Sequence, residues 1–455
     1  MHETRRLAEF VSGLRFEDLP QAAVEQACNL VLDDLGCCLA AWEVDSEKTR
    51  VASEYVASFG AKGEAHVVGA RGLASRAPLA AFANGVLSNA ADNDDTHKGA
   101  LAHISSVVIP AALAMAEARR LSGREMLASV VAGYEVASRV GMAVMPSHYE
   151  KWHSTATNCT FGAGATAARA LGLDADRTEM ALGFAGTQAA GLNAFFESGD
   201  MTKSVHPGKS AMNGIMGAEL AAIGGTAPPA ILERNKGYLA AFTEAPRPEV
   251  LAAGLGTKWE ILENGFKYYP SILASHAPIG ATLELVNRHD VKPADIAKLT
   301  LETYRTVTTH FSNYDPHGSM AARISVPFCM AVAAVDRTLG QAQFRPDRVE
   351  DPAVRGVLAK TEVLADDELN TLYPKNFPAR VTITLKDGTK HQTTWMFPKG
   401  DPQNPLSVPE LEDKFRSNAA GLLGEKGAER AVRLCRELPE AGAVGELMRL
   451  VALAG

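Results

Sequence analysis

Apolar residues recur every three or four positions through most of the first half of the chain, which is the spacing of an amphipathic helix. Within residues 21–42, the apolar positions that fall on one helical face are Val24, Cys28, Val31, Leu35 and Leu39. Similar stripes run through residues 107–121, 123–144 and 159–173, and many of the intervening residues are Ala or Gly. The pattern predicts closely packed helices from residue 21 to about residue 240.

The pattern changes after about residue 262. Residues 297–308 alternate between apolar and polar side chains, as a half-buried strand does. Residues 379–397 predict two strands joined by a turn at Asp387 and Gly388. Helical patterns at residues 330–340 and 354–364 lie between these strands. This part of the chain therefore predicts a small α+β domain.

From Ser407, a suitable N-cap residue before Glu410, the chain returns to a helical pattern. The predicted architecture is mainly α with a smaller α+β domain. A helical domain spans residues 1–262, the α+β domain spans 263–397, and helices in 398–455 return to the first domain. The chain of 455 residues is long enough for two domains.

Composition narrows the function classes. The formal net charge is −8, so no global field attracts nucleic acid or an acidic membrane surface. The N-terminal segment has no signal-peptide pattern, and we expect a cytoplasmic protein. The most apolar segment carries Glu135 and Arg139, which predicts a buried helix instead of a membrane span. Six cysteines without a CxxC motif predict buried thiols, not an iron–sulfur cluster.

The segment DNDDTHKGALAHIS at residues 92–105 concentrates carboxylates and imidazoles in an otherwise apolar region. It is not a calcium loop, because His97 and His103 occupy the positions that need glycine and glutamate. A divalent-metal site using both histidines is a minority interpretation. Two interpretations stay open at even weight: the acidic residues cap or solvate a helix end, or the segment carries acid–base chemistry.

Two sets of basic residues lie next to the starts of predicted helices. His153 stands before a helix rich in small residues, where backbone N–H groups attract anions. Lys203, His206 and Lys209 surround Pro207–Gly208 in a predicted loop that leads into a helix. A structural histidine and a solvated basic loop are the simpler explanations. The functional alternative is a clamp for a carboxylate or phosphate.

A third basic group contains Lys267, which lies among aromatic residues, and His276 nine residues later. A lysine in apolar surroundings attracts a carboxylate more strongly, although a lysine that reaches from such a surface to solvent is common. No nucleotide fingerprint, GxSxG elbow or recognisable metal set accompanies these groups. Together they suit proton transfer on a small molecule with several carboxylates.

The order of these motifs resembles the MmgE/PrpD family, which includes 2-methylcitrate dehydratase, cis-aconitate decarboxylase and iminodisuccinate epimerase. The segments that carry the resemblance are LPQAAVEQACNLVLDDLGCCLA, DNDDTH, WHSTAT, TKSVHPGKSAMNG, FKYYPSILASH, SVPFCMAVA and PKGDPQNPLS. The resemblance implies a helical domain built from both chain ends, an inserted α+β lid domain and a homodimer. It also implies an active site between the domains that needs neither a metal nor an organic cofactor.

The resemblance also implies roles for individual residues. We expect His103 to transfer the proton, tuned by Asp92, and Lys203 and Lys267 to hold substrate carboxylates. His153 and Thr96 would orient the substrate or assist the leaving group. The other expected substrate contacts are His206, Gly208, His276 and Phe328.

Two positions depart from the family pattern. The chain reads His103-Ile104-Ser105 where relatives have HPS, and Phe328 stands where a tyrosine is usual. The expected function is a cofactor-independent hydro-lyase that acts on a citrate-like di- or tricarboxylate. The alternatives are a decarboxylase, an epimerase of an amino-dicarboxylate such as iminodisuccinate, and a carboxylate-binding protein without catalysis.

Overall fold

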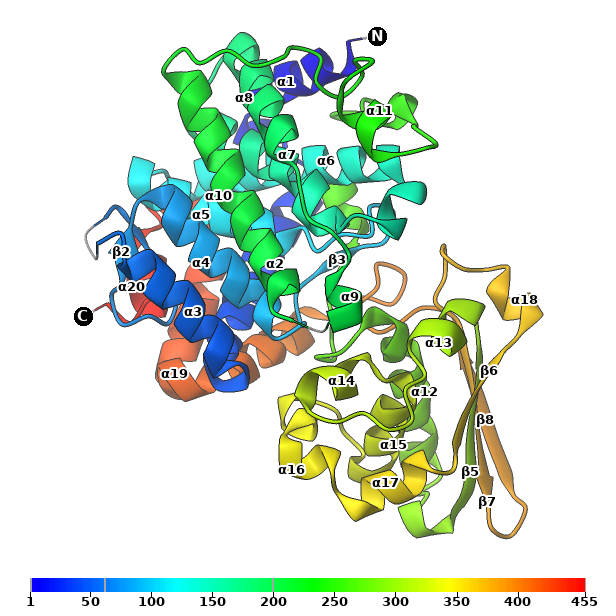
Figure 1. Cartoon of the computed structure of the whole chain (residues 1–455). Coiled ribbons are helices and arrows are strands. Elements are labelled where there is room, and N and C mark those ends of the chain that lie inside the picture. The colour runs from blue at the N-terminus through cyan, green and yellow to red at the C-terminus, as the bar shows by residue number, and fades with distance from the viewer. Residues whose placement is uncertain (1, 61–62, 199, 455) are drawn as a thin grey trace. The chain divides into compact units, whose positions relative to one another are not determined.

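The structure is a computed structural model that describes residues 2–60, 63–198 and 200–454 (Figure 1). The chain divides into two compact units. Unit 1 comprises Met1–Asn264 and Ser407–Gly455, and unit 2 comprises Gly265–Leu406. Unit 1 is therefore built from both ends of the chain.

Unit 1 is helical. Its helices are α1 (Glu3–Gly13), α2 (Gln21–Val44), α3 (Ser46–Ala57), α4 (Ala77–Ala90), α5 (Ser105–Arg119), α6 (Gly123–Val144), α7 (Ser154–Ala170), α8 (Ala175–Gln188), α9 (Phe195–Ser198), α10 (Thr202–Ala222), α11 (Tyr238–Phe242), α19 (Val408–Arg436) and α20 (Gly445–Val451). Its short strands are β1 (Ala65–His66), β2 (Ala74–Ser75) and β3 (Thr96–His97), and β4 (Asn264–Gly265) lies at the boundary between the units.

The predicted helices of unit 1 are confirmed, and small residues let them pack closely. A Cβ on Gly208 would lie 2.3 Å from the Phe82 carbonyl oxygen, so α10 approaches α4 at a distance that only glycine allows. Helix α6 has the length and hydropathy of a membrane span, but 94% of its most apolar 18-residue stretch is buried within the protein. The Ser407 N-cap is also confirmed, because its hydroxyl accepts from the Glu410 N–H.

The prediction of a loop around Pro207 and Gly208 is wrong, because α10 already begins at Thr202. Proline in a helix removes the hydrogen bond to the carbonyl four residues earlier, which disfavours helix in isolation. Here α10 packs against α4, α7 and α8 along its length. Tertiary burial therefore outweighs the local cost of the proline.

Unit 2 packs helices on a four-stranded sheet with the order β6-β5-β7-β8. The strands are β5 (Ile296–Thr303), β6 (Thr361–Ala365), β7 (Ala379–Leu385) and β8 (Lys390–Trp395). Strand β5 pairs in parallel with β6 and antiparallel with β7, which forms the predicted hairpin with β8. The helices are α12 (Leu273–Arg288), α13 (Arg305–His310), α14 (Ser319–Ile324), α15 (Val326–Asp336), α16 (Pro346–Val349), α17 (Pro352–Leu358) and α18 (Asp367–Asn370).

Two predicted elements of unit 2 need correction. The strand expected over residues 297–308 ends at Thr303, where both partner strands also end, and α13 follows. The helix expected over residues 354–364 ends at Leu358, and residues 361–365 form β6. Alternation along one chain does not reveal where its partner strands stop, nor that a short apolar segment will join a sheet.

A buried ion pair ties α19 to the rest of unit 1. The Lys414 ammonium on α19 lies 2.6 Å from the Asp33 carboxylate on α2 and donates to the Asn93 carbonyl at 2.8 Å. The two charged side chains are 5% and 1% exposed. The cost of removing both charges from water is offset only while the pair is intact. The six cysteines are buried free thiols, as predicted.

We predict that Lys414→Met lowers the free energy of unfolding by about 3–5 kcal/mol, because it leaves the Asp33 carboxylate buried without its cation. Adding Asp33→Asn to this variant should recover most of the loss, and urea unfolding measures both effects. Equal losses in the single and double variants would show that packing, not charge pairing, is responsible.

Candidate active site

Most of the segment at residues 92–105 is buried, although His103 is partly exposed, and its backbone is folded tightly between α4 and α5. Asp92 adopts a left-handed φ of 51°, and the carboxylates of Asp94 and Asp95 are fully covered. The His97 N–H donates to the Ala102 carbonyl at 2.9 Å, which closes the loop that carries His103. We call residues 92–105 the acidic loop.

The Asp95 side chain connects the acidic loop to α5 and α6. One carboxylate oxygen accepts from the Ser105 N–H at 3.0 Å, at the first residue of α5. The other oxygen accepts from the Tyr134 hydroxyl on α6 at 2.8 Å. Burial, followed by the neighbouring Asp94 carboxylate, raises the pKa of Asp95 to about 7. The Asp95 carboxylate therefore satisfies the first N–H of α5, although the N-cap residue of that helix is Ile104.

His103 is held at both its ring and its backbone. The ring Nδ1 lies 2.7 Å from the Asp95 carbonyl oxygen, and the backbone N–H donates to the Thr155 hydroxyl at 3.0 Å. A carbonyl oxygen only accepts, so Nδ1 must carry a hydrogen. The lone pair of the neutral ring then lies on Nε2. Thr96 is also close, with its hydroxyl 3.4 Å from Nδ1.

Asp92 pairs with a lysine that is remote in sequence. The Lys203 ammonium, on the first turn of α10, lies 2.7 Å from one Asp92 carboxylate oxygen. Burial lowers the pKa of Lys203, but the carboxylates of Asp92 and Asp94 raise it further, to above its ordinary value. The acidic loop thus gains a fixed positive charge beside its own carboxylates.

Two imidazoles meet next to this pair. His153 is the N-cap residue of α7, and its Nδ1 lies 3.0 Å from Nδ1 of His206 on α10. The Phe195 ring packs edge-on against both imidazoles. Burial and neighbouring cations hold the pKa of His153 well below its ordinary value, and burial lowers that of His206 to about 4. Both rings are therefore neutral near pH 7 and must adopt opposite tautomers at the shared contact.

Three helices begin at this cluster, namely α5 at Ser105, α7 at Ser154 and α10 at Thr202. The backbone N–H groups and the dipole at a helix N-terminus favour negative charge. Lys203 adds a full positive charge at the same place. Together these groups can attract and hold an anion such as a carboxylate.

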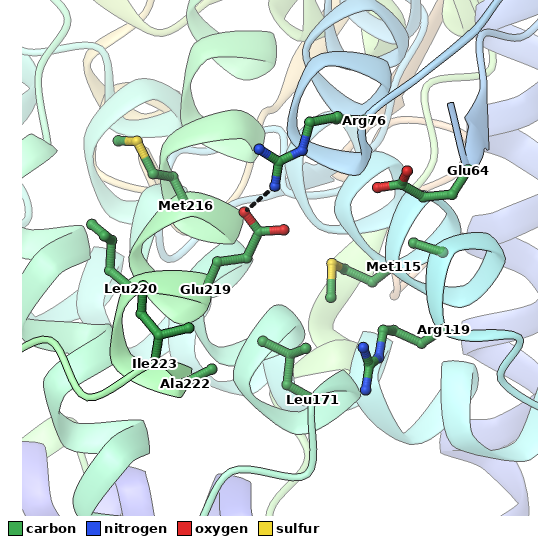
Figure 2. A pocket seen from close by; sticks show the side chains of 11 residues that line it. Glu64, Arg76, Met115, Arg119, Leu171, Met216, Glu219, Leu220, Ala222 and Ile223 are labelled. Atoms are coloured by element: carbon green, nitrogen blue, oxygen red, sulfur yellow. Dashed lines mark hydrogen bonds and ion pairs between the residues drawn. The ribbon is translucent and has the colours of Figure 1, made fainter. Parts of the chain in front are cut away.

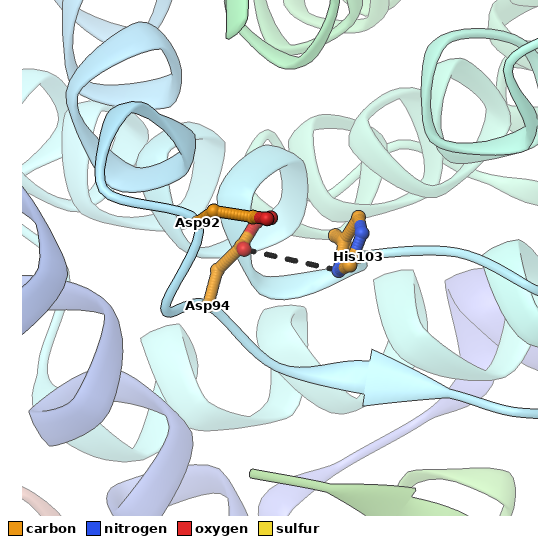
Figure 3. A group of neighbouring side chains, drawn as sticks. All are labelled: Asp92, Asp94 and His103. Carbon is orange, nitrogen blue, oxygen red and sulfur yellow. Dashed lines mark ion pairs between the residues drawn. The ribbon is translucent and has the colours of Figure 1, made fainter. Parts of the chain in front are cut away.

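The acidic loop also offers a possible set of metal ligands, drawn in Figure 3. One ligand atom each of Asp92, Asp94 and His103 lies within 4.8 Å of the others. The His103 atom that faces Asp94, at 3.8 Å, is Nδ1, which already donates to the Asp95 carbonyl. Asp92 is likewise engaged by the Lys203 ammonium. These contacts fit proton transfer and anion binding better than metal coordination.

The other predicted site residues belong to unit 2 or to helix packing. Lys267 and His276 are buried side chains of unit 2. Phe328 is fully buried in the core of unit 2, with its ring centre 6.2 Å from that of Phe344. Gly208 packs α10 on α4. The structure gives Phe328 and Gly208 packing roles, and contacts of these four residues with a substrate stay predictions.

A family model for the MmgE/PrpD N-terminal domain matches residues 5–251, and one for the MmgE/PrpD C-terminal domain matches residues 269–438. The chain belongs to the MmgE/PrpD family. The first match falls on unit 1, which carries the acidic loop and its lysine and histidine partners. The resemblance seen in the sequence motifs is therefore confirmed.

Full-length relatives agree with this membership. A cis-aconitate decarboxylase of Aspergillus terreus is 29% identical over 98% of this chain and 95% of the relative. The cis-aconitate decarboxylase-like protein oryM of Aspergillus oryzae is 28% identical over 99% and 97%. The human cis-aconitate decarboxylase is 27% identical over 96% and 92%. As a member of the MmgE/PrpD family with such relatives, the chain is an enzyme of the lyase type.

A separate pocket of about 680 Å³ lies on unit 1 of this MmgE/PrpD protein (Figure 2). Arg76 and Glu219 form an ion pair there at 3.3 Å, above apolar side chains that include Met115 and Leu171. Glu219 lies 16 residues after Lys203 on α10, or about 24 Å along the helix. The lining of this pocket contains none of the predicted site residues.

Sequence reasoning missed the residues that hold the acidic loop from outside, above all Tyr134, Lys414 and Asn89. Asn89 donates to the Asp94 carboxylate at 2.6 Å. The available signal was weak, because it consists of single polar side chains inside apolar helical patterns. His97 proved structural, since its Nδ1 accepts from the Ala100 N–H at 3.1 Å.

We predict that Asp95→Asn changes the pH dependence of stability. In the native protein the pKa of Asp95 is about 7, raised from an ordinary 3.8, so folding retains a proton that the unfolded chain releases between these values. The Asp95 contribution to stability is therefore present below pH 4 and is lost as pH rises through 7. Asparagine does not titrate, and it can keep both contacts if its amide oxygen accepts from the Ser105 N–H and its NH2 group donates to the Tyr134 hydroxyl oxygen.

The quantity to compare is the free energy of unfolding of Asp95→Asn minus that of the unsubstituted protein. Raising the pH from 5 to 8 should increase this difference by roughly 2 kcal/mol. Urea unfolding at the two pH values measures this difference, with the exposed Asp367→Asn as the control. A difference that stays constant with pH would contradict the assignment.

Proposed function

We propose that this protein is a cofactor-independent lyase that acts on a citrate-like tricarboxylate and releases one carboxyl group as CO₂. The observation that carries the proposal is His103, whose Nδ1 is committed to the Asp95 carbonyl beside the Asp92–Lys203 ion pair. That arrangement leaves Nε2 as the proton-transfer atom, near the Lys203 ammonium. The names of the relatives at 27–29% identity support decarboxylation of a cis-aconitate-like acid.

The proposed reaction breaks the bond between a carbon atom and its carboxylate carbon. CO₂ leaves, and the electron pair stays on the substrate carbon, where a neighbouring carboxylate delocalises it. Nε2 of the protonated His103 ring then donates its proton to the carbon chain, and solvent returns a proton to the ring. The Asp94 carboxylate, 3.8 Å from Nδ1, stabilises the imidazolium that this step requires.

The remaining carboxylates need cationic partners while negative charge builds up on the substrate. Lys203 and the N-termini of α5, α7 and α10 supply them in unit 1. In this proposal Thr96 and His153 orient the substrate. Neutral imidazoles at His153 and His206 can bind carboxylate oxygens without adding charge.

Elimination of water is a second candidate, and the His153–His206 pair favours it. A hydro-lyase needs a base for the carbon-bound proton and an acid for the departing hydroxide. Nε2 of His103 can take the carbon-bound proton and pass it to the departing hydroxide, which one imidazole of the pair can hold through a hydrogen bond from its Nε2–H. The same apparatus therefore suits either bond cleavage, and product analysis decides between them.

We predict that His103→Ala lowers kcat by about 10²- to 10⁴-fold, because the proton-transfer group is lost. NMR of a panel of di- and tricarboxylates in deuterated water measures turnover. Loss of a carboxyl carbon indicates decarboxylation, and loss of a hydroxyl group indicates dehydration. His310→Ala, which makes the same substitution at an exposed histidine, provides the control.

An unchanged kcat in a folded His103→Ala variant would remove His103 from the mechanism. Deuterium exchange without loss of carbon or water would instead identify an epimerase. Binding without turnover or exchange would identify a carboxylate-binding protein.

We predict that Lys203→Gln raises KM for the carboxylate substrate about 10- to 100-fold, the value of one charge-assisted hydrogen bond, and also lowers kcat, because Lys203 faces the charge that develops during bond cleavage. Lys209 lies on the same helix, but its ammonium donates to the carbonyls of Ala156 and Ala190. Lys209→Gln therefore serves as the matched control, with KM expected within about twofold of the unsubstituted value. Steady-state kinetics compares the two variants, and equal KM changes would argue against a carboxylate on Lys203.

A further inference from the structure

Asp95 contacts different partners through its main-chain carbonyl and through its side chain. The carbonyl oxygen accepts from Nδ1 of His103 at 2.7 Å, and the carboxylate accepts from Ser105 and Tyr134 at 3.0 and 2.8 Å. The carboxylate therefore fixes the orientation of the peptide group that contacts the catalytic ring. Tyr134 supplies the only one of these contacts that comes from outside the acidic loop and α5.

The Asp95 carbonyl decides which nitrogen of His103 carries the proton. A neutral imidazole can be protonated on either nitrogen, and its hydrogen-bond partner selects the form. The Thr96 hydroxyl, 3.4 Å from Nδ1, could select the opposite tautomer by donating to that nitrogen. It donates instead to the Asp95 carbonyl at 2.7 Å. As long as this carbonyl stays in place, both neighbours enforce the Nδ1–H form.

Tyr134 is suited to anchor that carbonyl. It is fully buried on α6, which α7 covers along its length. Without the phenol hydroxyl, one buried oxygen of Asp95 loses its donor, and an unsatisfied buried oxygen is costly. The carboxylate would then turn toward another donor and rotate the attached peptide away from His103.

We propose that Tyr134 and Asp95 are positioning residues that fix the Nδ1–H tautomer of His103 and so place the exchanging proton on Nε2. The catalytic consequence rests on the proposed function of His103, whereas the tautomer itself does not. The two can therefore be tested separately.

The test is ¹⁵N NMR of the full chain with labelled histidine, recorded without substrate, with the His103 signals assigned from the His103→Gln spectrum. In the unsubstituted protein we expect protonated Nδ1 and unprotonated Nε2. In Tyr134→Phe we expect a mixture of both tautomers, with kcat lowered about 10- to 100-fold and KM little changed. Asp95→Asn should retain the Nδ1–H form, because its amide oxygen can accept from the Ser105 N–H and its NH2 group can donate to the Tyr134 hydroxyl oxygen.

Tyr238→Phe is the matched control, because it also removes a buried hydroxyl, one that donates to Asn158 at 2.7 Å. It should leave the His103 signals unchanged. An Nε2–H tautomer in the unsubstituted protein would overturn the proposal without any variant, as would an unchanged tautomer in Tyr134→Phe. If the tautomer shifts as expected but His103→Ala remains active, the proposed function fails and the positioning role stands.

Discussion

Burial of the acidic loop is the constraint on which the rest of unit 1 depends. Polar groups removed from water must find partners inside the protein, or the fold loses several kcal/mol for each one. The partners come from separate helices: Asn89 from α4, Tyr134 from α6, Lys203 from α10 and Lys414 from α19. The helices are therefore arranged around the loop as well as around an apolar core. A site built in this way is rigid, because moving any one partner exposes an unsatisfied group.

The distribution of charge follows from the same burial. The loop and α2 bring the carboxyl groups of Asp33, Asp34, Asp94 and Asp95 into one low-dielectric region, where they cannot all ionise. Lys414 neutralises Asp33, whereas burial raises the pKa of Asp34 well above its ordinary value. The part of the cluster around Lys203 is different, because Asp92 is paired with Lys203, and α5, α7 and α10 begin nearby. The interior thus contains carboxyl groups that carry little net charge, and the part of the cluster around Lys203 attracts anions.

The sequence was informative where the determinants are local. Helical periodicity and the Ser407–Glu410 capping box depend on neighbouring residues, so α2, α5, α6 and the start of α19 could be predicted. Pairings across the fold could not. Lys203 and Asp92 are 111 residues apart, and Lys414 and Asn93 are 321 apart. Sequence reasoning could nominate Lys203 and Asp92 as chemically suitable, but only the packed helices show that they meet. Strand β6 was missed for the same reason, since its strand character depends on pairing with β5.

The Asp92–Lys203 pair also bears on how a substrate is bound and released. A lone ammonium at three helix N-termini would bind any polyanion tightly and hold the product as firmly as the substrate. Such uniform binding does not accelerate the chemical step. Because Asp92 already occupies one side of the ammonium, an arriving carboxylate gains only the remaining interaction. Affinity for the ground state is then moderate, and the extra charge that develops during bond cleavage can draw more fully on Lys203. The ion pair therefore fits a role in favouring the transition state over the bound acid.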